Sequence, residues 1–131
     1  MIMKSGKHIL VVEDDKMTAR LLIYRLQALG HRVEHINDGI EGFNYIKEHK
    51  PDLIVLDVML PGMSGFEILE NLNSSEDVNI SELNVIMLTT KNRAEEIQRG
   101  FKLGALEYLS KPFKIEEFLV RLNRIASTTS T

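Results

Sequence analysis

The sequence contains no cysteine and no tryptophan, and it has no long apolar run. Without cysteine the chain can form no disulfide framework, no Cys-ligated zinc site and no catalytic thiol. No apolar run approaches the roughly 20 residues that a membrane-spanning helix needs. Residues 1–7 are polar and lack the apolar core of a signal peptide. We therefore expect a cytoplasmic protein that does not contact the membrane.

The sequence also has no large excess of charge of one sign. It contains 16 basic and 19 acidic residues, which gives a net charge of −3. A protein that binds nucleic acid nonspecifically has a basic surplus, so we expect no direct nucleic-acid binding. The 131 residues suffice for one hydrophobic core and not for two. We expect one domain over residues 1–126 and a disordered polar tail over residues 127–131.

Short apolar runs alternate along the chain with segments whose apolar residues recur every three or four positions. This pattern predicts strands at 8–12, 32–36, 52–57, 84–88 and 106–109, and helices at 15–29, 38–49, 64–72, 93–102 and 114–125. Residues 73–81 are polar and are expected to form a longer surface loop. The alternation predicts an α/β fold with a single doubly wound, five-stranded parallel sheet flanked by five helices.

Polar and charged side chains follow the predicted strands at their carboxyl ends, where ligands bind in such sheets. Glu13 and Asp14 follow the first strand, and Asp57 stands at the carboxyl end of the third. Thr89 follows the fourth strand and Lys111 the fifth. One acidic residue after a strand is often only a helix cap, but three carboxylates at one edge repel each other unless a cation compensates. Oxygen ligands suit a hard divalent ion, so the pattern indicates a Mg²⁺ site.

Four motifs follow each other in order over residues 7–125. They are residues 11–14 (VVED), 53–65 (LIVLDVMLPGMSG), 85–89 (VIMLT) and 104–113 (GALEYLSKPF). Together they resemble the receiver domain of bacterial two-component response regulators. The resemblance implies the flavodoxin-like receiver fold, with strand order 2-1-3-4-5.

The resemblance also implies roles for the residues at the strand ends. Asp57 would accept a phosphoryl group from the phosphohistidine of a sensor histidine kinase or a histidine phosphotransfer protein. The implied Mg²⁺ ligands are Glu13, Asp14, Asp57 and the main-chain carbonyl of Met59. Lys111 would add positive charge and Thr89 a hydroxyl beside the phosphoryl oxygens. The bond between Lys111 and Pro112 is typically cis in this family. The chain would be a signalling module that catalyses its own phosphorylation, and not an enzyme with a separate substrate.

A switch is implied by the same resemblance. On phosphorylation Thr89 would move toward the phosphoryl group and Tyr108 would rotate inward. This movement would shift the surface formed by the fourth helix, the fifth strand and the fifth helix, for which couplings of about 1–3 kcal/mol suffice. A phosphorylation-dependent homodimer is one expected output. The alternative is a partly buried Tyr108 with no switching role.

The sequence departs from the usual family pattern beside the acceptor. Thr90 stands where the family usually has a smaller residue, and its branched side chain would narrow access to the phosphoryl group. Met59 and Lys91 occupy nearby positions that tend to set the lifetime of the phosphorylated state. We expect these three residues to tune that lifetime.

The expected switch surface also differs from the charged dimer surface of the winged-helix subfamily. Ile97 and Leu106 are apolar there, and we interpret them as a contact patch, although isolated apolar residues are common on surfaces. Glu107 and Arg121 are placed to form an ion pair. This interpretation assumes that the inner face of the fourth helix carries Ala94, Gln98 and Phe101.

Three other functions remain as alternatives. A haloacid-dehalogenase-like phosphatase, which uses an aspartate nucleophile and Mg²⁺, needs a second acid where Met59 stands. A flavodoxin-like electron carrier needs a Ser/Thr/Gly-rich phosphate loop where residues 13–15 are all acidic. A receiver-like interaction module without phosphorylation has no use for the complete set of reactive residues. The four histidines do not have the paired spacing of metal ligands, and we expect them to be structural. They are His8, His31, His35 and His49.

Overall fold

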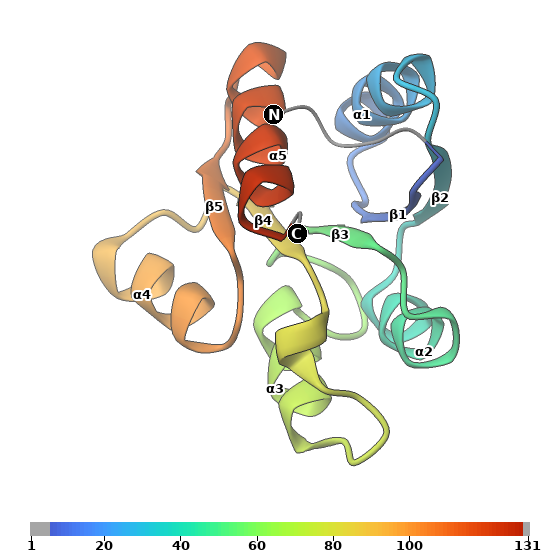
Figure 1. Ribbon diagram of the computed structural model, residues 1–131. Coiled ribbons are helices and arrows are strands. Elements are labelled where there is room, and N and C mark those ends of the chain that lie inside the picture. The colour runs from blue at the N-terminus through green and yellow to red at the C-terminus, as the bar shows by residue number, and fades with distance from the viewer. Residues whose placement is uncertain (1–5, 130–131) are drawn as a thin grey trace.

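The computed structural model describes residues 6–129 and shows one parallel sheet with helices on both faces (Figure 1). The strands are β1 (His8–Val12), β2 (Arg32–Ile36), β3 (Leu53–Leu56), β4 (Val85–Thr89) and β5 (Glu107–Ser110). The helices are α1 (Lys16–Ala28), α2 (Gly39–His49), α3 (Gly65–Ser74), α4 (Ala94–Lys102) and α5 (Ile115–Thr129). The strand order is β2-β1-β3-β4-β5, which confirms the predicted fold.

The predicted boundaries differ from the observed ones by a few residues. Thr89 is the last residue of β4 and not the first residue after it. The expected loop at 73–81 includes the end of α3 and the start of a 3-10 helix at Ile80–Glu82. The backbone of α5 continues to Thr129, so residues 127–129 of the predicted tail are helical. Residues 130–131 of that tail lie outside the described residues.

Each face of the sheet has its own hydrophobic core. The helices α1 and α5 cover one face, whereas α2, α3 and α4 cover the other (Figure 1). Along β1 the side chains alternate between the two cores: Ile9 and Val11 belong to the α1/α5 core, and Leu10 and Val12 to the opposite core. A strand that is buried on both faces must be apolar at every position, which explains the unbroken apolar run at residues 9–12.

Polar side chains cap the first turns of α1 and α3. Asp15 accepts a hydrogen bond from the amide of Thr18 at the start of α1. Ser64 and Glu67 form a reciprocal capping box at the start of α3. These caps fix where each helix begins, directly after the loops that carry the functional residues.

The prediction for the inner face of α4 is wrong. The three residues expected inside are exposed: Ala94, Gln98 and Phe101. Ile97 instead packs against the core, and Gly100 is buried. A Cβ atom added at Gly100 would lie 2.7 Å from Cε2 of Tyr108, so the glycine lets α4 approach the ring on β5 closely. Because glycine contributes no hydrophobic signal, the spacing of the apolar residues predicted the wrong buried face for α4.

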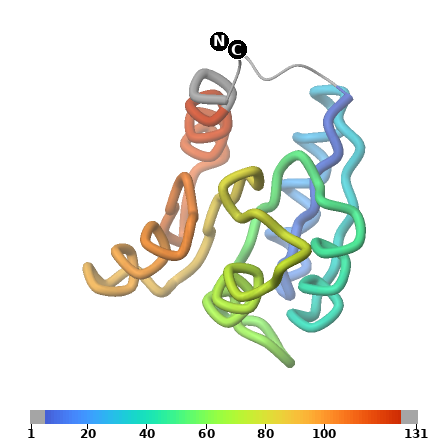
Figure 2. Tube along the Cα trace, turned by 60° about the horizontal axis from the view of Figure 1, so that its bottom comes forward, coloured from blue at the N-terminus to red at the C-terminus, as the bar shows by residue number. Residues whose placement is uncertain are grey.

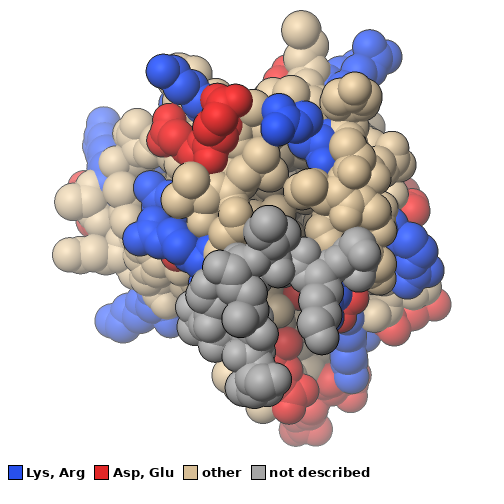
Figure 3. Space-filling view, turned by 45° about the horizontal axis from the view of Figure 1, so that its top comes forward, with Lys and Arg blue, Asp and Glu red and all other residues tan. Residues whose placement is uncertain are grey.

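The arrangement places α4 far from α1 and α2. In the turned view of Figure 2, the orange α4 lies at the opposite edge of the molecule from α1 and α2, as the strand order requires. On the face shown in Figure 3, basic and acidic side chains are interspersed. None of the helices within residues 6–129 combines the length and apolar character needed to cross a membrane.

Candidate functional site

Three carboxylates meet where β1 and β3 end. Glu13 and Asp14 directly follow β1, Asp57 directly follows β3, and the two strands are paired neighbours. Each of the three side chains offers one oxygen, and these oxygens all lie within 4.8 Å of one another. Glu13 is only 1% exposed and Asp57 5%, whereas Asp14 is exposed. The convergence predicted from the strand ends is therefore present.

Lys111 reaches this cluster from the end of β5. Its Nζ lies 2.5 Å from Oε1 of Glu13 and 3.1 Å from Oδ2 of Asp57. Its amide donates to the carbonyl of Thr89, with an N–O distance of 2.9 Å, and its peptide bond to Pro112 is cis, as the resemblance implied. One ammonium group thus contacts the two most buried carboxylates of the site.

Burial dominates the electrostatics of Glu13. Loss of water raises the pKa of Glu13 to about 7, although its contacts with Lys111 and the amide of Asp15 pull in the opposite direction. Burial on its own lowers the pKa of Lys111, but the close contact with Glu13 and the charge of Asp57 outweigh it and leave that pKa raised. Lys111 therefore stays protonated, and Glu13 holds its negative charge at a cost.

The oxygen cluster fits a hard divalent cation. Among the described residues, Glu13 Oε1 is buried without a hydrogen bond, since the contact with Lys111 is an ion pair outside hydrogen-bond geometry. The amide of Met59 donates to Oδ1 of Asp57 at 3.2 Å, which brings the main chain of Met59 next to the cluster. Carboxylate and carbonyl oxygens are the ligands Mg²⁺ prefers, and it keeps several waters beside them. The predicted ligand set is therefore chemically suitable.

The side chains expected to tune the site lie on the loops after β3 and β4. Thr89 is fully buried, and its Oγ1 accepts a hydrogen bond from the amide of Lys91 at 3.1 Å. Thr90 is exposed, and its hydroxyl donates to Sδ of Met59 at 3.5 Å. Thr90 and Met59 therefore meet across the gap between the two loops. The expected narrowing of the approach to Asp57 stays a prediction.

Tyr108 lies inside the molecule, with 6% of its surface exposed. Its hydroxyl donates to the carbonyl of Lys91, so the ring connects β5 to the loop between β4 and α4. Burial, followed by the charges of Glu96 and Asp57, raises the pKa of Tyr108 to about 12. The phenol is thus a neutral hydrogen-bond donor, in the inward position that the resemblance assigns to the phosphorylated state.

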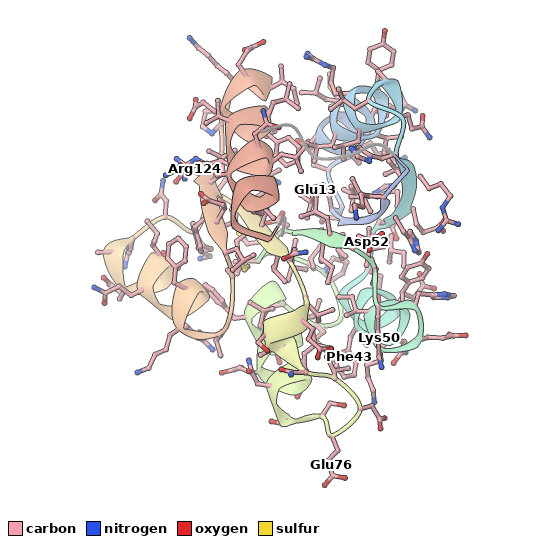
Figure 4. All side chains as sticks on the ribbon, viewed as in Figure 1. Glu13, Phe43, Lys50, Asp52, Glu76 and Arg124 are labelled. Carbon is pink, nitrogen blue, oxygen red and sulfur yellow. The ribbon has the colours of Figure 1, made fainter. Side chains whose placement is uncertain are left out.

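The residues predicted to form an interface are only partly available. Arg121 Nη1 lies 3.1 Å from Oε1 of Glu107, so the expected ion pair forms within the chain. Arg124, which lies beside β5 (Figure 4), also contacts Glu107, at 3.6 Å. Ile97 is partly buried and packs against the core, whereas Leu106 is 37% exposed. The contact patch of Ile97 and Leu106 stays a prediction.

Sequence reasoning missed one contact of the site. The histidines were expected to be structural, with nothing converging on His35. Nε2 of His35 instead lies 2.7 Å from the carbonyl oxygen of Glu13. The one signal for this contact was the position of His35 in the sequence. It lies next to the end of β2, beside the strand that Glu13 follows.

Comparisons with known proteins agree with this geometry. A family model described as the response regulator receiver domain matches residues 9–123. The chain is 40% identical over 115 residues to the uncharacterized transcriptional regulatory protein YkoG of Bacillus subtilis, a match that covers 88% of this chain and 49% of YkoG. It is 38% identical over 122 residues to the response regulator MprA of Mycobacterium sp. (strain KMS), which covers 93% of this chain and 51% of MprA.

Solved structures give the same result. The non-phosphorylated HemR receiver domain from Leptospira biflexa superposes with a TM-score of 0.84 at 38% identity. That match covers 96% of this chain and 98% of the HemR chain. The chain spans about half the length of the curated relatives it matches, 49% and 51% for the two named above.

Proposed function

The chain belongs to the response regulator receiver domain family, and from this premise we propose that it is a phosphorylation-dependent switch with Asp57 as the phosphoryl acceptor. The donor is the phosphohistidine of a sensor histidine kinase or of a histidine phosphotransfer protein. The observation that carries the proposal is the buried carboxylate of Asp57, 3.1 Å from the ammonium group of Lys111 and beside two further acids.

Asp57 is held in position for the transfer by its neighbours. The amide of Met59 binds Oδ1 and the ammonium of Lys111 binds Oδ2, so the plane of the carboxylate is fixed. One carboxylate oxygen attacks the phosphorus, the P–N bond to the donor imidazole breaks, and the imidazole takes up a proton. Lys111 offsets the negative charge of the peripheral phosphoryl oxygens. This matters because phosphoryl transfer depends mainly on positioning and electrostatic stabilisation.

The metal ligands in this proposal are Glu13, Asp14, Asp57 and the main-chain carbonyl of Met59. A bound Mg²⁺ supplies positive charge that lets the carboxylates and the phosphoryl group coexist at one edge of the sheet. Among the residues that the structure describes, Lys111 is the cation that contacts both Glu13 and Asp57.

The output of the switch passes through Thr89 and Tyr108. Thr89 ends β4, and its hydroxyl accepts a hydrogen bond from Lys91, whose carbonyl in turn accepts one from Tyr108. A movement of the Thr89 hydroxyl toward a phosphoryl oxygen breaks the first of these contacts and reaches Tyr108 through Lys91. The surface of α4, β5 and α5 then changes its affinity for a partner or a second copy of the chain.

The experiment that tests this function is incubation with Mg²⁺ and a small phosphodonor, followed by intact-mass measurement. We expect a gain of one phosphoryl group that hydroxylamine removes, and no gain when a chelator takes up the Mg²⁺. Asp57→Asn should abolish the gain. The matched control is Asp77→Asn, the same substitution at an exposed loop position, which should be labelled like the wild type. Equal labelling of the Asp57 variant would refute the assignment.

A further inference from the structure

His35 lies at the point where the ladder between β1 and β2 ends. The last paired residues are Val12 and Ile36. One step further, the amide of Glu13 donates to the carbonyl of Ile36 at 3.0 Å. The chain after Ile36 turns away into α2, whose N-cap is Asp38, so β2 offers no further main-chain pairing beside the acidic loop.

The side chain of His35 supplies the next hydrogen bond in place of the backbone. Its Nε2 lies 2.7 Å from the carbonyl oxygen of Glu13. A carbonyl oxygen only accepts hydrogen bonds, so Nε2 must carry the proton and donate. The main chain of Glu13 is thus held at its amide by Ile36 and at its carbonyl by His35.

The rest of the acidic loop is held from its other end. Oε2 of Glu13 accepts a hydrogen bond from the amide of Asp15 at 3.1 Å. Asp15 in turn caps α1 through the amide of Thr18 at 3.0 Å. Asp14 lies between these two anchors and is exposed, so the direction of its carboxylate follows from how firmly its neighbours are held.

We propose that His35 is a positioning residue that fixes the main chain of Glu13 and thereby orients the Glu13 and Asp14 carboxylates for Mg²⁺. This inference rests on the proposed function, because it assigns His35 a role toward the metal of that site. His35 touches neither the metal nor the phosphoryl group; it acts through the carbonyl of a ligand residue. Groups that orient metal ligands in this way typically change metal affinity by about 10- to 100-fold.

The test compares Mg²⁺ binding by isothermal titration for the wild type and three variants, with no phosphodonor present. His35→Phe keeps a ring and removes the N–H donor, and it should weaken Mg²⁺ binding by about tenfold. His35→Gln restores an N–H at the same number of bonds from Cα, and it should bind within about threefold of the wild type. The matched control is His49→Phe, at the end of α2, which should bind like the wild type.

Urea unfolding of the metal-free variants separates positioning from simple loss of stability. If His35→Phe and His35→Gln are equally destabilised but only His35→Phe loses affinity, the hydrogen bond itself positions the ligands. An unchanged affinity in His35→Phe, with normal wild-type binding, overturns this inference and leaves the proposed function intact. A wild type that binds no Mg²⁺ overturns the proposed function, and the positioning role with it.

Discussion

Glu13 is the residue with the largest electrostatic conflict in the site. It is almost fully buried, its pKa is raised to about 7, and within residues 6–129 its Oε1 has an ion-pair partner but no hydrogen bond. Lys111 cannot satisfy both carboxylates fully, because it is shared with Asp57. A divalent cation strongly stabilises the ionised form of a buried acid that is held in this way. We infer that Glu13 makes Mg²⁺ binding sensitive to pH.

The affinity for Mg²⁺ should rise with pH until Glu13 is fully ionised. The pKa of Glu13 lies at about 7 in the folded chain and at 4.5 in its unperturbed state. A proton must leave Glu13 before the metal binds, so the dissociation constant should be about tenfold larger at pH 6 than at pH 8. By the same shift, the folded metal-free chain binds more protons than the unfolded chain between these two pKa values. The contribution of Glu13 to stability therefore falls as pH rises through this range.

Isothermal titration at several pH values measures this dependence. Glu13→Gln should weaken binding and remove most of its pH dependence. The control is Glu76→Gln, since Glu76 points away from the molecule on the connection between α3 and β4 (Figure 4). A wild-type dissociation constant that is the same at pH 6 and pH 8 would contradict the role of Glu13.

At the scale of elements, the close contact of Gly100 with Tyr108 contributes more to the packing of α4 than its charged groups do. Arg99 pairs with Glu70 at 3.0 Å and stacks over the ring of Phe66 at 4.6 Å. Both partners of that ion pair are about half exposed, and exposed pairs contribute little. Gly100, by contrast, is buried directly against Tyr108. The inward position of Tyr108 therefore depends on a glycine at position 100.

Gly100→Ala should push α4 and the ring of Tyr108 apart. The added Cβ would lie 2.7 Å and 2.8 Å from two ring atoms, which is too close for either group to stay in place. Overpacking costs about 1–3 kcal/mol, and the higher helix propensity of alanine offsets about 1 kcal/mol of that. We expect a net loss of about 1 kcal/mol in the free energy of unfolding, measured in urea, and greater exposure of Tyr108 by tyrosine fluorescence quenching.

The control for this substitution is Gln98→Ala on the exposed face of the same helix. It should change stability by less than about 0.5 kcal/mol and leave Tyr108 buried. If Gly100→Ala is as stable as the wild type and its tyrosine exposure is unchanged, the close contact does not hold Tyr108 inside.

At the scale of the whole molecule, the edge formed by α4, β5 and α5 carries exposed apolar side chains. They are Phe101, Leu106 and Val120. Both arginines of α5 are already engaged within the chain, because Arg121 and Arg124 contact Glu107. Association through this edge would therefore depend on apolar contacts more than on ion pairs between copies.

We expect the chain to self-associate only in the phosphorylated state, and we expect this association to require Leu106. In sedimentation velocity, the wild type with Mg²⁺ and a beryllofluoride mimic of the phosphoryl group should form dimers, and Leu106→Glu should stay monomeric. Leu106 is a better choice than Ile97, whose substitution would also disturb the core. Met17→Glu is the matched control, since Met17 is 79% exposed on α1; it should dimerise like the wild type. Dimers of the Leu106 variant would exclude this edge.

The sequence predicted the fold and the carboxylate cluster for a physical reason: both follow from local patterns. Short apolar runs and helical periods define the elements, and parallel pairing then brings Glu13 and Asp57 to one edge. The face of α4 and the role of His35 were not predictable in this way. The first depends on a glycine that fits against Tyr108, and the second on a side chain that bonds to the main chain of a neighbouring strand. Neither contact produces a periodic pattern in the sequence.

The central claim is that Asp57 takes up the phosphoryl group, and the most direct measurement identifies the modified residue. After incubation with Mg²⁺ and a phosphodonor, borohydride reduction converts an aspartyl phosphate to homoserine, which peptide mass spectrometry then locates. We expect homoserine at position 57 and unmodified aspartate at position 14. Homoserine at another position, or at none while the chain gains phosphoryl mass, would contradict the account.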